Sequence, residues 1–170
     1  VNSMPDIAMK PNRRLLLFLP LAHAFARYMQ FFCFAGNVSL GLSSNLKTIL
    51  ADFKAFKPTF ILAVPRIFEK IYNAASQKAG AGFKGRVFAD ATQTAYDWSH
   101  AQQSGGSIPL ALNAKHALYN KLVYSSIMEV FGGHVEYAVS GGAPLDSSIA
   151  HFFNGVGLPL LEGYGMTETC

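Results

Sequence analysis

The chain has 170 residues, of which 51% are hydrophobic and 14% are charged, and its formal net charge is +4. This length suits one domain with a buried core, and this composition excludes a disordered, acidic or collagen-like chain. Because about a quarter of the residues are charged in a typical free-standing domain, we expect a larger protein to cover part of this surface.

Several classes of protein are excluded at once. The basic cluster at residues 10–14 is short and lacks an RNA-binding signature, so no nucleic-acid partner is expected. Cys33 and Cys170 are too few for a disulfide framework or a zinc site. The apolar run at 15–19 lies behind a dozen other residues and is too short to span a bilayer, which excludes a secretory signal and favours a cytoplasmic location.

Strand and helix patterns alternate over the first half of the chain. Continuous apolar runs stopped by proline predict buried strands at 15–19 and 59–64, and a further strand is predicted at 38–42. Apolar residues at helical spacing predict helices at 25–34 and 66–79, and a third that contains Ile49, Phe53 and Phe56. Ser44 or Asn45 is the expected N-cap of that third helix.

The second half begins with a loose glycine connection, a helix at 83–103 and a linker at 104–107. A single long helix is predicted at 109–131, with four residues facing a core: Leu118, Leu122, Ile127 and Phe131. A strand through Val135, Tyr137 and Val139 follows, then a short helix at 145–154 and a last strand at 158–161. This order predicts an α/β fold, a mostly parallel sheet with helices on both faces. We expect a single domain over 1–170 with a helical insertion at about 80–132.

The first candidate binding loop is Ser140-Gly141-Gly142-Ala143-Pro144, directly after the predicted fourth strand. Ligands of parallel sheets bind beyond the carboxyl ends of the strands. Two glycines remove side chains and give a flat surface of backbone amides and carbonyls, and Pro144 suits the first turn of the next helix. Such a surface fits a base or a sugar, but a tight turn without a ligand explains this loop equally well.

The second candidate loop, Gly163 to Thr169, follows the last predicted strand. Tyr164 lies between Gly163 and Gly165 and can present its ring for stacking on a planar base. The hydroxyl of Thr167 suits phosphate oxygens, and Glu168 is an oxygen ligand of the kind that Mg²⁺ prefers. A solvent-exposed loop with one structural tyrosine is the weaker alternative.

His23 ends a third turn, Leu19-Pro20-Leu21-Ala22-His23, after the first strand. A lone histidine is more often structural than catalytic. The position of His23 at the end of a strand favours a catalytic role only modestly. The motifs of three other kinds of site are absent from the sequence. It has no Gly-x-Ser-x-Gly nucleophile elbow, no Gly-Lys-Ser/Thr phosphate loop and no paired metal-ligating histidines.

The motifs taken together resemble the adenylate-forming superfamily of acyl-CoA synthetases, nonribosomal-peptide adenylation domains and luciferases. The resemblance is carried by Ser140 to Leu145 and by Glu162 to Thr169, about twenty residues further on. Two more segments, Leu19 to His23 and Pro58 to Tyr72, make the chain similar to the long-chain fatty acyl-CoA synthetases. The matches extend from about Lys10 to the end, so the chain looks like the central part of the large, AMP-binding N-terminal domain.

The resemblance implies an ATP-dependent ligase that activates a long-chain fatty acid through an acyl-adenylate and then forms a thioester with coenzyme A. Gly141, Gly142, Ala143 and Pro144, with Gly163, Tyr164 and Gly165, would bind the nucleotide. Thr167 would touch the α-phosphate, Glu168 would hold Mg²⁺, and His23 would lie near the substrate carboxylate. Phe152 and Phe153 are candidates for the wall of the acyl channel, although core packing explains them equally well.

The resemblance also implies missing parts. Nothing in residues 1–14 looks like the family's phosphate loop, and the ribose-binding aspartate and catalytic lysine are expected beyond Cys170. Ala26 stands where relatives often carry an acidic residue. We therefore expect an incomplete domain that is inactive alone. Activation of an aryl or amino acid, and a non-catalytic nucleotide- or lipid-binding module, are the alternatives; peripheral membrane association is compatible with a fatty substrate, but no anchor is visible.

Overall fold

A five-stranded parallel sheet forms the centre of the computed structural model, which describes residues 12–105 and 107–165. The strands lie side by side in the order β2-β1-β3-β4-β5, and each neighbouring pair is parallel. Their bounds are β1 Arg14–Leu17, β2 Ser39–Leu42, β3 Phe60–Ala63, β4 Tyr137–Gly141 and β5 Leu160–Gly163. The predicted α/β fold with a mostly parallel sheet is confirmed.

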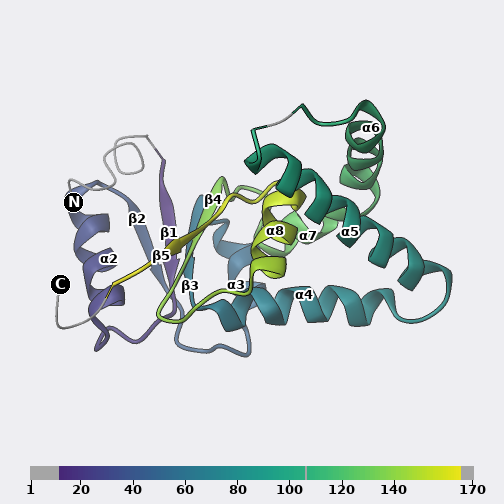
Figure 1. The fold of residues 1–170 in the computed structure, drawn as a ribbon. Helices are drawn as coiled ribbons and strands as arrows, with labels where there is room; N and C mark the ends of the chain where they lie inside the picture. The colour runs from purple at the N-terminus through teal and green to yellow at the C-terminus, as the bar shows by residue number, and fades with distance from the viewer. Residues whose placement is uncertain (1–11, 106, 166–170) are drawn as a thin grey trace.

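Helices connect the strands and cover both faces of the sheet (Figure 1). Their bounds are α2 Ala24–Ala35, α3 Ile49–Phe56, α4 Pro65–Ala79, α5 Phe83–Gln103, α6 Leu110–Tyr119, the π-helical turn η1 Asn120–Tyr124, α7 Ser125–Val130 and α8 Ser147–Val156. Helix α2 lies on one side of the sheet, and α3, α4 and α8 lie on the other (Figure 1).

The strands are apolar on both faces because each face has its own core. Successive side chains of a strand point to opposite faces. Leu15 and Leu17 accordingly pack with Ala26, Met29 and other residues of α2. Leu16, from the same strand, belongs to the larger core under α3, α4, α5 and α8. This two-sided burial is why the strands appear in the sequence as unbroken apolar runs.

The prediction of a single long helix at 109–131 is wrong in one respect, because the π-helical turn η1 divides the helix into α6 and α7. A π turn holds more residues than an α turn and shifts the faces of the helix. Leu118 and Leu122 are exposed, at 56% and 61%, instead of facing the core. Tyr124 takes the inward position, fully buried, while Ile127 and Phe131 are buried as predicted.

Tyr124 fixes this segment against α5, since its hydroxyl donates a hydrogen bond of 2.7 Å to the carbonyl of Ala91. Burial raises the pKa of this phenol well above its usual value, so it stays protonated and remains a donor. In the intact protein, Tyr124→Phe should lower the free energy of unfolding by about 1 kcal/mol, the usual worth of a hydrogen bond. Denaturant unfolding measures this. Tyr119→Phe, which removes a half-buried hydroxyl bonded to Asp90, is the comparison. An unchanged midpoint for Tyr124→Phe would contradict the assigned role.

Two helix starts also differ from expectation. The N-cap of α3 is Thr48 and not Ser44 or Asn45; the Thr48 hydroxyl bonds to the Asp52 side chain instead of capping a backbone amide. Helix α8 starts at Ser147 because Asp146 caps it, accepting a 2.7 Å hydrogen bond from the Ser148 amide. Pro144 therefore precedes the helix and does not lie in its first turn.

Candidate functional site

The two candidate loops meet at the carboxyl edge of the sheet. Strands β4 and β5 are neighbours, and their register pairs Gly141 with Gly163 and Ser140 with Glu162. Parallel pairing thus places the starts of both glycine loops, far apart in the sequence, directly beside each other. The sheet forms one continuous floor from the first loop to the second.

The strand order places the turn with His23 at the same edge. The chain leaves β1 through α2 on one face and leaves β3 through α4 on the other. Such a reversal opens a crevice at the carboxyl ends of the two strands, the usual ligand position in sheets of this kind. His23 precedes α2 at this edge, and Val64 precedes α4 there.

Close contacts link this crevice to the glycine loop. A side chain on Gly141 would place its Cβ 2.9 Å from the ring of Phe25, the second residue of α2. Gly142 has a φ of +83°, a conformation that favours glycine, and Val64 lies next to it. The backbone of the loop is thus held between residues that follow β1 and β3.

A side chain from β5 ties the two loops together. The Glu162 carboxylate accepts a hydrogen bond of 3.2 Å from the Leu145 amide. One residue further on, both the hydroxyl and the amide of Ser148 donate to Asp146 and hold the pKa of that carboxyl below its usual value. The loop therefore has a fixed end on each side, at Gly141 in the strand and at Asp146 in the helix cap.

The predicted site residues at this edge are mostly open to solvent. His23, Gly142, Ala143, Pro144 and Gly165 are exposed, while Gly163 is half-buried and Gly141 is buried in the strand. Tyr164 is 91% exposed, which leaves its ring free to meet a planar ligand. Thr167, Glu168 and Thr169 lie outside the described residues. The parts of both loops that the structure describes come together; the roles of individual residues stay predictions.

The start of helix α4 contributes positive charge at this edge. Helix α4 begins at Pro65 with no side-chain cap, so its first backbone amides lie at this edge with Arg66 beside them. Helix N-termini carry a partial positive charge. Within residues 12–105 and 107–165, no group of three histidine, cysteine or acidic residues is arranged to hold a metal ion. The predicted magnesium ligand, Glu168, is not among those residues.

An apolar hollow lies beside the glycine loop on the α2 face of the sheet. Its lining residues come from α2, β3 and β4: Phe25, Tyr28, Met29, Phe60, Leu62, Tyr137 and Val139. Phe25 lines this hollow and also touches Gly141, so the apolar surface reaches the candidate nucleotide loop.

Phe152 and Phe153 lie on the other face and pack in the core. They are 1% and 0% exposed, and their rings contact each other and the rings of Tyr72, Phe88, Phe68 and Phe131. For these two residues the geometry favours core packing.

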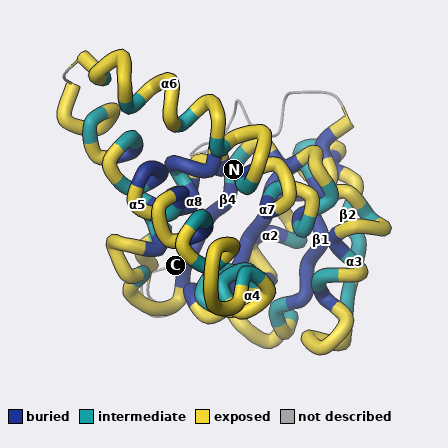
Figure 2. The backbone as a smooth tube through the Cα atoms, turned by 90° about the vertical axis from the view of Figure 1, so that its right-hand side faces the viewer, coloured by how far each residue is buried: buried dark blue, intermediate teal, exposed yellow. Residues whose placement is uncertain are grey.

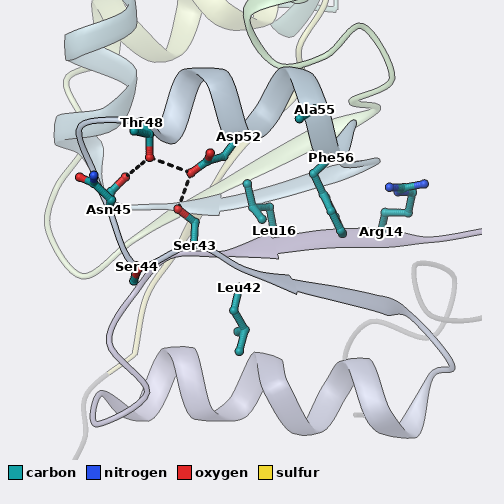
Figure 3. A pocket seen from close by; sticks show the side chains of 10 residues that line it. All are labelled: Arg14, Leu16, Leu42, Ser43, Ser44, Asn45, Thr48, Asp52, Ala55 and Phe56. Atoms are coloured by element: carbon teal, nitrogen blue, oxygen red, sulfur yellow. Dashed lines mark hydrogen bonds between the residues drawn. The ribbon is translucent and has the colours of Figure 1, made fainter.

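A different hollow, between α3 and strands β1 and β2, contains none of the predicted site residues (Figure 3). Its acidic group, Asp52, accepts hydrogen bonds from Ser43 at 2.6 Å and from Thr48 at 3.1 Å (Figure 3). These hydroxyls stabilise the turn into α3, so the polar end of this hollow has a structural explanation.

Three residues that shape the candidate site were given no role from the sequence: Phe25, Val64 and Glu162. Phe25 and Val64 are apolar and resemble any core residue in a sequence pattern. For Glu162 a signal existed, because an acidic residue directly before a glycine loop at a strand end can bind a neighbouring amide.

Comparison with known proteins identifies the family of this chain. Residues 1–170 match the family of AMP-binding enzymes. The long-chain-fatty-acid–CoA ligase FadD15 of Mycobacterium bovis is 48% identical over 161 residues, which make up 95% of this chain and 27% of the relative. Long chain acyl-CoA synthetase 3 of Arabidopsis thaliana is 34% identical, over 91% of this chain and 23% of its own length. This chain thus spans about a quarter of these relatives.

A solved structure shares the fold. The adenylation domain of a carboxylate reductase from Mycobacterium chelonae superposes with a TM-score of 0.63 at 23% identity, over 90% of this chain and 20% of that one. The adenylation domain of the Segniliparus rugosus carboxylic acid reductase, solved with AMP and a carboxylic acid, gives 0.57 at 24% identity, again over 90% and 20%. From the sequence match over its whole length, the chain belongs to the family of AMP-binding enzymes.

Proposed function

We propose that the intact protein activates a long-chain fatty acid with ATP and transfers it to coenzyme A. In the first half-reaction a carboxylate oxygen attacks the α-phosphorus of ATP, and pyrophosphate leaves. In the second, the thiol sulfur of coenzyme A attacks the acyl carbon, and AMP leaves. This chain would be the central part of the large N-terminal domain of the enzyme, with its helical insertion at about 80–132.

The observation that carries the proposal is the junction of the two loops through the Gly141–Gly163 pair. Exposed backbone at Gly142 and Ala143 fits the edge of an adenine or ribose, and the open ring of Tyr164 fits the face of the base. The hollow that Phe25 shares with this loop places apolar side chains beside the candidate nucleotide site, although its cavity of about 40 Å³ is much smaller than a long acyl chain. The long-chain ligases among the relatives support the same substrate.

In this proposal the chain supplies positioning and charge neutralisation, on which phosphoryl-type transfer mainly depends. His23 would orient the carboxylate at the crevice, and Thr167 would bind the α-phosphate. Glu168 would hold Mg²⁺, which neutralises phosphate charge when bound. We also propose a cytoplasmic location, compatible with peripheral association with a membrane. No helix in the described part of the chain is long and apolar enough to cross a membrane.

The decisive experiment is pyrophosphate exchange into ATP by the intact protein, with fatty acids, aryl acids and amino acids compared at equal concentration. We expect exchange that depends on a long-chain fatty acid. Exchange driven only by aryl or amino acids would assign another carboxylate, and nucleotide binding without any exchange would indicate a non-catalytic module.

Tyr164→Ala in the intact protein should raise the KM for ATP. Stacking of a base on an aromatic ring is worth about 1–3 kcal/mol, which corresponds to a change of about 5- to 150-fold. Steady-state kinetics at saturating fatty acid measures this. Tyr164→Phe retains the ring and should stay near the wild-type value; an unchanged KM for ATP in the alanine variant would remove the tyrosine from the base site.

A further inference from the structure

The apolar hollow between α2 and the sheet narrows with distance from the glycine loop. On this face of the sheet, β4 presents Tyr137, Val139 and Gly141, and β3 presents Phe60 and Leu62. The register pairs Phe60 with Tyr137 and Leu62 with Val139. The side chains therefore grow in size from a glycine at the carboxyl edge, through a row of valine and leucine, to an aromatic row deeper in the sheet.

The aromatic row closes the inner end of this hollow. The rings of Phe60 and Tyr137 are stacked, with 5.6 Å between their centroids and 11° between their planes. Arg13 lies one row further toward the amino edge, since Leu15 pairs with Phe60. Its guanidinium is 5.9 Å from the centroid of the Tyr137 ring and pairs with the Glu136 carboxylate at 2.9 Å. An apolar group extended past the two rings would disturb this buried charge, which is costly unless it is paired.

Tyr137 contributes its ring and not its hydroxyl to this arrangement. The hydroxyl is buried without a hydrogen-bond partner among the described residues, although most buried polar groups are bonded. Burial raises the pKa of this phenol well above its usual value, so the group stays neutral beside an apolar hollow. Since no hydrogen bond explains the residue, the size of its ring is the property that shapes the hollow.

The two sides of the hollow differ in how far they can yield. The hollow encloses only about 40 Å³, so a bound chain has to displace some of the side chains that line it. Strand β4 is largely buried, whereas α2 alternates between buried and exposed positions (Figure 2). Tyr28 of α2 is 40% exposed and Phe25 is half-buried, but Phe60 is only 1% exposed. The α2 side can therefore open toward solvent, while the aromatic row has no space to move into.

We propose that Tyr137, stacked on Phe60, limits the length of the acyl chain that the site accepts. The carboxylate would lie at the crevice, and the chain would run along β4 from Gly141 to Tyr137, a distance of about 13 Å for four residues of a strand. Once the methyl end meets the aromatic row, further methylene groups gain no buried surface. The inference rests on the proposed function in taking a fatty acid as the ligand. Because it concerns binding, it can fail while pyrophosphate exchange succeeds, and the reverse.

The test is displacement of a fluorescent fatty acid from the intact protein by saturated acids of increasing length, without ATP. In the wild type, affinity should rise about fourfold with each buried methylene group and then level off at a limiting length. Tyr137→Ala should move this limit to longer chains. Acids two methylene groups beyond the wild-type limit should then bind at least about tenfold tighter than they bind to the wild type. Tyr137→Phe retains the ring and should keep the wild-type limit.

The matched control is Tyr72→Ala. Tyr72 is also a half-buried tyrosine, but it packs on Phe152 on the opposite face of the sheet, with 4.9 Å between ring centroids. Its loss should leave the limiting chain length unchanged. If Tyr137→Ala does not fold, Tyr137→Leu decides, because it removes the ring and keeps an apolar side chain.

Three results would overturn the proposal. The first is a folded wild-type protein that binds no fatty acid at any length. The second is a limiting length that is the same in the wild type and in the variant without the ring. The third is an equal shift in Tyr72→Ala, which would mean that any loosening of the core admits longer chains.

Discussion

Glu168→Ala is expected to lower the rate of fatty-acid-dependent pyrophosphate exchange in the intact protein by at least about 100-fold, the scale of losing one group that stabilises developing charge. The proposed role of Glu168 is to hold Mg²⁺, whose charge offsets that of the phosphates. Glu168 follows Gly165, the last described residue of the loop, by three positions. Loss of its carboxylate should therefore affect the reaction centre directly.

Stability separates this role from a structural one. Because the role proposed for Glu168 is to hold Mg²⁺ and not to pack against the fold, its replacement should change Tm by no more than about a degree or two. Glu168→Gln retains the size of the side chain and should lose activity almost as strongly, since the charge is what binds the metal. Parallel losses of Tm and activity would reject the assignment, and so would rescue by glutamine.

Gly155→Ala is expected to destabilise the protein strongly, although it adds only one methyl group. Helices α5 and α8 cross at this glycine, and a Cβ would lie 2.0 Å from the Ala95 carbonyl oxygen. The obstacle is backbone, so the helices must separate, at a cost of about 3 kcal/mol or more. Thermal unfolding of the intact protein measures the loss.

The same substitution should also disturb the candidate site. Helix α8 begins directly after the glycine loop, and the Gly155 carbonyl accepts the His116 hydrogen bond that holds α6. The matched control is Gly165→Ala, compared for stability only, because a Cβ there meets nothing within 4 Å. Equal Tm values for the two variants would show that the helices can separate without cost.

The sheet was predictable because its strands are covered on both faces. Burial on two sides requires an apolar residue at every position, as in residues 15–17 and 60–63, and prolines near the strand ends limit their extent. Most helices were predictable for the corresponding reason. A helix that packs one face on a core repeats its apolar residues at helical spacing, and α5 runs from Phe83 to Gln103 as predicted.

The segment 109–131 was harder to predict, because its apolar residues fit two registers. Leu118 and Leu122 repeat as well as Tyr124 and Ile127 do, and leucine is a stronger apolar signal than tyrosine. Contact with α5 places Tyr124 in the core, because its ring is buried there while its hydroxyl donates a hydrogen bond to the Ala91 carbonyl. The π turn accommodates the change of register. No local pattern contains this choice, because the deciding partner lies more than thirty positions away.

The sequence by itself determined the family, the parallel sheet and the two glycine loops, since these depend on local residue types and on spacing along the chain. Only the tertiary structure decided which segments meet. It paired Gly141 with Gly163, brought Phe25 and Val64 against the first loop and tied that loop to Glu162. It also turned Leu118 and Leu122 outward. The physical reason is that strand order and helix crossing are set by packing between distant parts of the chain, which hydrophobic periodicity does not encode.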